Sequence, residues 1–498
     1  MILSTDNLKN INVQGLQKPD AEIFDLPVKV LQFGTGVLLR GLPDYFIDKA
    51  NRQGIFDGRV VVVKSTDTGS ADDFDKQDGL YTIYSKGIEN GKEVSEQIIC
   101  SAISEVLSAA NDWACILDLA ASPDLQIIIS NTTEVGIQPV EEDINQRPPQ
   151  SYPGKLLAVL YQRYKTFGGS AASGLIIIPT ELITDNGKKL KSIVLDLARF
   201  NKLEDEFISW IENHNIFCNS LVDRIVPGKP TKELVAAQES ERGYTDNLHI
   251  MSETYCLWAI EGDERVASVL SFCQSDDRVV IRPDIEIFRE LKLRLLNGSH
   301  TLSCAVALIS GLETVKEAMD NTDFLKFITG LAYKEIIPSI PYKIEPEVAV
   351  DFARKVLDRF RNPYIRHEWL SISMQYTTKI KMRVIPLLLN HYKINHTVPV
   401  NMAFGFAAFI RFMKIEGNHR GSINGREYSV NDSRAGYFAQ VWENADADQV
   451  VKKVLSNKDL WDADLTKLPG FKEEVLKDLK RIIAAGEKEI TLAELHQS

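Results

Sequence analysis

Residues 28–64 constrain the fold more than any other part of the sequence. The run at 28–33 is apolar and β-branched, as in a buried strand. Residues 38–52 have the spacing of an amphipathic helix, and 58–64 form a second apolar run after a short turn. Consecutive parallel strands need a crossover of this length, so the segment predicts a βαβ unit and hence a parallel sheet.

The rest of the chain divides into a part with strand-like apolar runs and a part with apolar residues at helical spacing. The runs at 125–130 and 175–179 are continuously apolar, as expected for strands covered on both faces. From about Pro283, strand-like runs become rare, and apolar residues recur at helical spacing over 291–308, 314–319, 348–361, 380–392 and 403–413. We therefore expect an α/β protein with a Rossmann-like, doubly wound sheet domain at 1–283 and a mostly α-helical domain at 284–498.

Composition narrows the kind of ligand. The 498 residues are 44% hydrophobic, and the formal net charge is −12, with no basic block that would suit a nucleic acid. The N-terminus lacks a signal-peptide pattern, and no run is long enough to cross a bilayer. These features predict a soluble, cytoplasmic protein that binds a small molecule, neither nucleic acid nor membrane, and they do not specify an oligomeric state.

The cysteines and histidines predict no metal site. The six cysteines are scattered singly, and the eight histidines lack the HExxH or HxH spacing of a zinc site. We expect buried thiols, as in a cytosolic protein.

A cofactor site is predicted where the first strand ends. Gly34 and Gly36 match the first two glycines of G-x-G-x-x-G, which let the backbone approach a pyrophosphate at a helix N-terminus. Leu39 stands at the third position. A strand-to-helix turn without a ligand is the alternative, but the position after a buried strand and before a helix favours a dinucleotide.

Asp67, just beyond the second strand, bears on which dinucleotide binds. Its carboxylate could accept hydrogen bonds from the ribose hydroxyls and would repel a 2′-phosphate, which favours NAD over NADP. Lys64 and Ser65 nearby weaken this preference, and a turn-forming aspartate explains Asp67 equally well.

A possible proton-transfer site lies in the second half. Lys292, Asn297 and His300 bring together an amine, an amide and an imidazole. On a continuous α-helix, Asn297 would lie about 140° and His300 about 80° from Lys292 around the axis. Arg294 is a candidate positive charge for tuning that lysine. On pattern alone, a half-exposed helix with solvated charges and a core histidine is the stronger interpretation.

A family resemblance changes that balance. The segment 292–301 resembles the active-site signature of the mannitol dehydrogenase family, the polyol-specific long-chain dehydrogenases. Further similarities, in the same order along the chain, lie at 33–40, 77–82, 130–136, 221–227 and 359–363. Within the family, 151–155, 176–187 and 362–367 most resemble the branch that acts on hexuronates. That resemblance implies NAD-linked, metal-independent interconversion of D-tagaturonate and D-altronate in hexuronate catabolism.

The resemblance also implies roles for particular residues. Lys292 would be the general acid and base, Asn297 would donate to the developing oxyanion, and His300 would orient substrate hydroxyls. The cofactor would be bound by Gly34, Thr35, Gly36, Val37, Leu38, Asp67 and Asn131. One departure concerns a second oxyanion donor: where mannitol dehydrogenases carry Cys-Asp-Asn, this chain has Thr180-Glu181-Leu182, and Leu182 cannot donate.

A sugar acid needs an anchor for its carboxylate, best supplied by Arg or Lys. Lys379 is the first candidate and Arg383 the second, with a solvated basic helix face as an equal alternative. Asp223 is a further candidate substrate ligand, although a buried ion pair with Arg224 explains it as well.

The sequence leaves two other function classes open. A fructuronate reductase or mannitol-type dehydrogenase would keep the chemistry and change the pocket, and the Thr180–Leu182 run argues against the mannitol type. A nucleotide-binding protein without catalysis would have no need of the lysine-centred triad.

Overall fold

The computed structural model describes residues 1–65, 72–132, 136–227, 232–416, 419–423 and 425–485. The chain forms two compact units. Unit 1 comprises 1–87 and 93–285, and unit 2 comprises 88–92 and 286–498. The sequence-based boundary was 283/284. Within the described residues, every helix is too short or too polar to span a lipid bilayer.

The central sheet of unit 1 is parallel throughout and has the strand order β6-β3-β2-β7-β8-β9. Numbered along the chain, this is the doubly wound order 3-2-1-4-5-6 of dinucleotide-binding folds. The strands are β2 (Val28–Phe33), β3 (Arg59–Lys64), β6 (Ile103–Ser108), β7 (Ile127–Ser130), β8 (Ile176–Pro179) and β9 (Ile216–Phe217). The order reverses between β2 and β7, so their carboxyl ends form the switch point where such sheets bind ligands.

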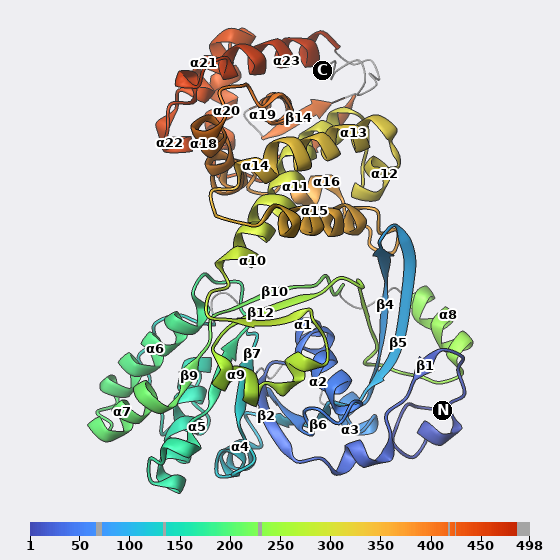
Figure 1. The fold of residues 1–498 in the computed structure, drawn as a ribbon, viewed down its shortest axis with the longest axis vertical. Coiled ribbons are helices and arrows are strands. Elements are labelled where there is room, and N and C mark those ends of the chain that lie inside the picture. Colours follow the sequence, from blue (N-terminus) through green and yellow to red (C-terminus); the bar gives the residue numbers. More distant parts are fainter. Residues whose placement is uncertain (66–71, 133–135, 228–231, 417–418, 424, 486–498) are drawn as a thin grey trace. The chain divides into compact units, whose positions relative to one another are not determined.

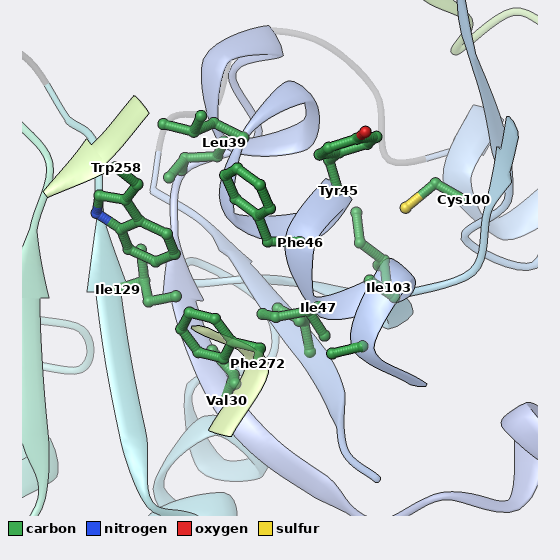
Figure 2. Close-up of a cluster of buried hydrophobic side chains, with 14 of the residues drawn as sticks. Val30, Leu39, Tyr45, Phe46, Ile47, Cys100, Ile103, Ile129, Trp258 and Phe272 are labelled. Carbon is green, nitrogen blue, oxygen red and sulfur yellow. The ribbon is translucent and has the colours of Figure 1, made fainter. Parts of the chain in front are cut away.

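Both faces of this sheet are covered, as the continuous apolar runs predict. On one face, alternate strand residues such as Leu31 and Ile128 pack against α4 (Trp113–Ala120), α5 (Tyr152–Phe167), α6 (Asn186–Phe200) and α7 (Asp205–His214). On the other face, Val30 and Ile129 pack under α1 (Val37–Gly41) and α2 (Pro43–Asn51). Figure 2 shows Phe46 of α2 and Trp258 within this second cluster.

Two smaller sheets complete unit 1, except that residues 88–92, at the tip of one hairpin, belong to unit 2 (Figure 1). One has the order β1-β5-β4-β11 and contains β1 (Leu16–Gln17), β4 (Tyr81–Glu89), β5 (Lys92–Cys100) and β11 (Ile250–Ser252). The other has the order β10-β12-β13, with β10 (Ser220–Asp223), β12 (Leu257–Glu261) and β13 (Val279–Arg282). The other α-helices in the described part of unit 1 are α3 (Asp72–Lys76), α8 (Lys232–Arg242) and α9 (Glu264–Val269).

The predicted helix at 38–52 is interrupted. It forms α1 and α2, which are separated by Leu42 at φ −135° and ψ −76°, outside the helical region. Pro43 then occupies the first turn of α2, where its missing N–H is not needed. The chain bends here because the residue before a proline is disfavoured in the helical conformation.

Unit 2 is mostly helical. Its first long helix runs through α10 (Glu286–Leu291), the π turn η5 (Lys292–Leu296) and α11 (Asn297–Ile309). A second contains α17 (Tyr376–Lys379), the π turn η7 (Ile380–Val384) and α18 (Ile385–Ile394). Around them lie α12 (Val315–Asp320), α13 (Thr322–Gly330), η6 (Leu331–Ile336), α14 (Ile337–Ser339), α15 (Pro346–Phe360), α16 (Trp369–Ile372) and α19 (Val400–Phe412).

The C-terminal part of unit 2 contains the hairpin of β14 (Arg420–Ile423) and β15 (Arg426–Ser429). It then continues through α20 (Ala435–Trp442), α21 (Ala447–Leu455), α22 (Lys458–Trp461) and α23 (Phe471–Ala485). Helices α19 and α23 pack together through aromatic side chains, including an edge-to-face pair of Phe406 and Phe471.

Candidate functional site

The candidate cofactor loop leaves β2 at the switch point of the unit 1 sheet. Gly34 has φ +127°, a conformation that side chains rarely adopt. A Cβ on Gly34 would lie 2.8 Å from the carbonyl oxygen of Asn131, which follows β7. The loop therefore requires glycine at this position, because the backbones after β2 and β7 approach each other closely.

The second glycine of the loop is needed for a different reason. Gly36 precedes α1, and a Cβ there would meet no heavy atom within 4 Å. The fold alone therefore does not require glycine at this position, whereas a pyrophosphate against the backbone would. Thr35, Val37 and Leu38 complete the loop, and Leu39, at the third fingerprint position, is fully buried beside Gly34.

A polar network fixes the segment that follows β7. The side-chain amide of Asn131 donates to the carbonyl oxygen and the hydroxyl of Thr180, at 3.1 and 3.0 Å. The buried carboxylate of Glu181 accepts from the Ser130 hydroxyl and from both the backbone N–H and the hydroxyl of Thr132. Sequence reasoning missed Glu181, whose carboxylate orders this loop. Asp67 lies outside the described residues.

A buried acidic residue lies beneath the cofactor loop. Asp44 of α2 is fully buried, and it accepts from the Gln32 amide, which also donates to the carbonyl oxygen of Gly34 at 3.5 Å. Burial raises the pKa of Asp44 to about 7. The Tyr81 hydroxyl bonds Asp44 at 3.5 Å and the carbonyl oxygen of Arg40 at 2.9 Å. The sequence pattern did not single out Asp44.

The predicted residues of β8 and β10 have different surroundings. Leu182 is 64% exposed at the carboxyl end of β8, with no polar atom to offer a ligand. Asp223, the last residue of β10, is buried within unit 1. Arg224 has a structural role, since its guanidinium donates to the carbonyl oxygens of Gly41 and Glu253 and to the Ser85 hydroxyl.

The candidate catalytic segment is a π turn, which corrects the α-helical geometry expected from the sequence. The backbone N–H of Asn297 bonds the carbonyl oxygen of Lys292, an i to i+5 bond. The wider turn brings the residue five positions later nearly above the first, whereas an α-helix would separate these two side chains by about 140°. Lys292 and Asn297 therefore share one face and are both partly exposed.

His300 lies one turn further along α11 and is buried. Its ring stacks on Phe360 with centroids 4.0 Å apart and meets the edges of His367 and Trp369. Its Nε2 has no hydrogen-bond partner among the described residues. Burial, reinforced by neighbouring cations, lowers the pKa of His300 well below its usual value, so the imidazole is neutral near pH 7.

Positive side chains gather around this histidine. The ring of His367 and the cationic side chains of Arg359, Arg383 and Lys379 all lower the pKa of His300. Burial and then Arg383 lower the pKa of Lys379, and burial lowers the pKa of Arg383 to about 10. Lys379 donates to the carbonyl oxygen of Ile372, and Arg383 to the Thr301 hydroxyl. Unit 2 thus concentrates partly desolvated cations beside His300, including both predicted carboxylate anchors.

Arg294 is not a free charge beside Lys292. Its guanidinium forms a two-point ion pair with Glu290, at 2.9 and 3.1 Å. It also donates to the carbonyl oxygens of Met382 and Arg383 in η7. Among the described residues, no group of three or more His, Cys, Asp or Glu side chains is placed to hold a metal ion.

Comparison with known proteins accounts for both units. Residues 28–272 match the mannitol dehydrogenase Rossmann domain, and 284–483 match the mannitol dehydrogenase C-terminal domain. Altronate oxidoreductase of Bacillus subtilis is 37% identical over 479 residues, which cover 95% of this chain and 97% of that protein. The Shigella flexneri protein of the same name is 37% identical over 472 residues, 93% and 96% of the two chains.

Two solved structures share the fold over nearly the full length. A substrate-free D-sorbitol dehydrogenase superposes with a TM-score of 0.81 at 20% identity and covers 100% of both chains. The ternary complex of Pseudomonas fluorescens mannitol 2-dehydrogenase with NAD and D-mannitol superposes with a TM-score of 0.68 at 20% identity and covers 99% of both chains. The predicted fold class, a Rossmann-like sheet domain followed by a mostly helical domain, is confirmed.

Proposed function

Because this chain belongs to the mannitol dehydrogenase family, we propose that it is an NAD-dependent oxidoreductase that interconverts D-tagaturonate and D-altronate. Its similarity to altronate oxidoreductases extends over 95% of the chain. The observation that carries the proposal is the position of Lys379 and Arg383 near the buried His300, where Arg383 bonds the hydroxyl of the adjacent Thr301, since a sugar acid differs from a neutral polyol by a carboxylate that such cations would bind.

The residues of unit 2 would divide the reduction among them. NADH, when bound, supplies the hydride that reaches the carbonyl carbon. The ammonium of Lys292 gives its proton to the carbonyl oxygen, and in the oxidative direction the free amine takes the proton back from the hydroxyl. Asn297 donates to the same oxygen as negative charge develops there. The unpartnered Nε2 of His300 would bond a substrate hydroxyl and orient it.

The residues of unit 1 would hold the cofactor. Gly36 leaves room for the pyrophosphate, with the first N–H groups of α1 at Val37 and Leu38 directed to it. Gly34, Thr35 and Asn131 would form the floor of this site at the switch point, where the backbones of Gly34 and Asn131 approach closely. Asp67 remains the proposed acceptor for the ribose hydroxyls. We infer a cytoplasmic location, since all six cysteines are free thiols.

A panel assay tests the assignment. NADH oxidation would be followed with D-tagaturonate, D-fructuronate, D-tagatose and D-fructose at equal concentrations. The proposal predicts the highest kcat/KM with D-tagaturonate. A higher kcat/KM with D-fructuronate would support the proposed reaction but change the assigned stereochemistry of the substrate. Absence of turnover with both uronates would reject the proposed substrate class.

The role of Lys292 has its own test. Lys292→Ala should keep the Kd for NADH, because the cofactor residues lie in unit 1, and should lower kcat for reduction at least ~100-fold, since the proton donor is lost. Cofactor fluorescence gives the first quantity and single-turnover NADH oxidation the second. An unimpaired variant would move the proton donor to another residue.

A further inference from the structure

Arg294 is the middle residue of the π turn η5 and uses all of its guanidinium nitrogens within the protein. Nε and Nη2 bond the two carboxylate oxygens of Glu290, one turn earlier. Nη1 donates to the carbonyl oxygens of Met382 and Arg383, at 2.7 and 3.1 Å. The side chain is only 7% exposed. This single residue therefore joins the helix of Lys292 to the helix of Lys379 and Arg383.

The Met382 carbonyl needs an outside donor for a reason visible in the sequence. In an α-helix it would accept from the N–H of residue 386, which is proline and has none. The backbone adapts by forming η7, which is closed by an i to i+5 bond from the Ile385 N–H to the Ile380 carbonyl oxygen. Arg294 supplies a donor for the oxygen that Pro386 leaves without its α-helical partner.

A second connection joins the same two helices one turn later. The Arg383 guanidinium donates to the Thr301 hydroxyl at 3.1 Å, and that hydroxyl donates to the Asn297 carbonyl oxygen at 2.7 Å. Between the two connections lies Gly298, where a Cβ would be 3.5 Å from Leu387. The turn that carries Lys292 and Asn297 is thus joined to its neighbour at its middle, through Arg294, and one turn beyond its end, through Thr301.

The turn η5 differs from the other π turns in the described part of unit 2. The turns η6 and η7 are each followed, two residues after their last residue, by a proline: Pro338 and Pro386. The residue at the equivalent position after η5 is Gly298. No proline prevents η5 from reverting to the α register, in which Asn297 would rotate away from Lys292. Its register must be held by side chains.

We propose that Arg294 is a positioning residue: with Glu290 it holds η5 in the π register and fixes it to η7, so that Lys292 and Asn297 stay on one face at a set distance from Lys379 and Arg383. The kinetic consequence rests on the proposed function, and the structural consequence does not. The nearby pair of Arg289 and Glu286 provides a matched control, since it is an ion pair on the same helix whose members are both more exposed.

The structural consequence is tested by hydrogen exchange on the full-length protein. In Arg294→Ala, the amides of Asn297 and Ile385, which close the two π turns, should exchange at least ~10-fold faster than in the wild type. Arg289→Ala should leave both amides within ~2-fold of the wild type. Unchanged exchange at these two amides in Arg294→Ala would overturn the proposal.

The kinetic consequence is tested with the ketose that the wild type reduces best. Arg294→Ala should lower kcat ~100-fold, because small displacements of reacting groups are costly, and keep the Kd for NADH. Millimolar guanidinium, which can refill the cavity and remake the bonds, should restore part of kcat, whereas equal potassium chloride should not. A kcat within ~2-fold of the wild type, or a loss that guanidinium does not relieve, would count against a positioning role.

If Arg294→Ala fails to fold, Arg294→Lys tests the positioning role instead. An ammonium keeps the charge beside Glu290 but cannot bond the carboxylate and both carbonyls in the planar fork, so kcat should still fall at least ~10-fold. An unchanged kcat in a folded Arg294→Lys protein would overturn the proposal. Failure of the wild type to reduce any keto-uronate would reject the proposed function alone, because the exchange experiment needs no substrate.

Discussion

His300 combines a favourable stack with an unfavourable burial. Its ring is packed on Phe360 at a centroid distance of 4.0 Å, and yet Nε2 has no hydrogen-bond partner among the described residues. A buried polar atom without a partner costs roughly 1–3 kcal/mol of stability. Proteins keep such a cost where a ligand supplies the missing bond.

Replacement of His300 by phenylalanine should therefore have opposite effects on stability and activity. His300→Phe retains a ring against Phe360 and removes the unpartnered nitrogen, so Tm should stay the same or rise. The same change removes the bond to the substrate hydroxyl and should lower kcat/KM for the uronate at least ~100-fold. Thermal unfolding and NADH oxidation measure the two effects.

His391 offers the matched control. It is also buried in unit 2, but its Nδ1 and Nε2 bond the Ser339 hydroxyl and the carbonyl oxygen of Thr397. His391→Phe should therefore cost about 2 kcal/mol of stability and leave kcat/KM within ~3-fold. If His300→Phe destabilised the protein as much as His391→Phe, His300 would be an ordinary core residue.

Asp44 makes a pH-dependent contribution with a defined sign. Burial raises its pKa to about 7, above the value near 3.9 of an unfolded aspartate. The folded protein therefore holds the proton more tightly, so the contribution is complete below pH 4 and is lost progressively as pH rises to 7. The asparagine in Asp44→Asn cannot ionise. The variant should therefore keep the free energy of unfolding that the wild type loses by pH 7, on the order of 2–4 kcal/mol.

The measurement is chemical unfolding of wild type and variant between pH 5 and pH 8.5. The difference in unfolding free energy, variant minus wild type, should increase across this range. Asp124→Asn, a change of an exposed aspartate, should give a flat difference. A flat difference for Asp44→Asn as well would mean that this carboxyl is ionised in the folded protein throughout.

At the scale of elements, the two glycines of the cofactor loop should respond differently to the same methyl group. Gly34→Ala should destabilise the fold by about 2 kcal/mol or more, because its φ is +127° and the added Cβ would lie 2.8 Å from the Asn131 carbonyl oxygen. Gly36→Ala meets nothing within 4 Å and should fold normally, but its methyl group would obstruct the pyrophosphate and raise the Kd for NADH at least ~10-fold.

Thermal unfolding and fluorescence titration with NADH separate these two outcomes. Gly54, which also has a positive φ and open space around it, provides a variant remote from the loop, since Gly54→Ala should affect stability alone. Unaltered NADH affinity in Gly36→Ala would show that no phosphate lies against this part of the backbone.

The elements differ in how far the sequence predicts them. Four strands of the parallel core were predictable because they contain apolar runs, and β2 occupies the predicted 28–33. The mixed polar and apolar run of β6 was not predicted. The β4–β5 hairpin was missed although Asn90-Gly91 at its turn, with φ of +52° and +73°, is a strong hairpin signal. Each π turn adds one residue to its helix and shifts the apolar repeat by only one position, so periodicity over a short window does not identify it.

The residues of the candidate site also divide into those that local sequence predicts and those that it does not. Lys292, Asn297 and His300 were found through a short signature, but their relation in space depends on one extra residue in a helical turn. Glu181 and Asp44 were missed because a lone carboxylate on an apolar background carries no local pattern. Their roles come from contacts with residues distant in sequence, such as Glu181 with Ser130 and Asp44 with Tyr81.

At the scale of the whole molecule, the charge near the candidate site has the opposite sign to the net charge of the chain. The chain carries a formal net charge of −12, which would repel an anionic sugar acid. The cations near His300, including Lys379 and Arg383, are a local exception, and their partial burial strengthens their attraction for a carboxylate relative to a solvated lysine. Substrate charge should therefore be recognised by this cluster, while the rest of the protein contributes an unfavourable field.

The corresponding prediction concerns selectivity between a uronate and its neutral counterpart. Lys379→Met and Arg383→Met should each lower kcat/KM for D-tagaturonate by about 10- to 100-fold, mainly through KM, because each removes a charged hydrogen-bond donor worth roughly 1.5–3 kcal/mol. The kcat/KM for D-tagatose, which lacks the carboxylate, should change much less, so the ratio of the two measures recognition of charge. Lys381→Met is the matched control, since Lys381 lies on the same helix but pairs with Asp462. Equal losses for both sugars would show that Lys379 and Arg383 shape the helix and do not bind the carboxylate.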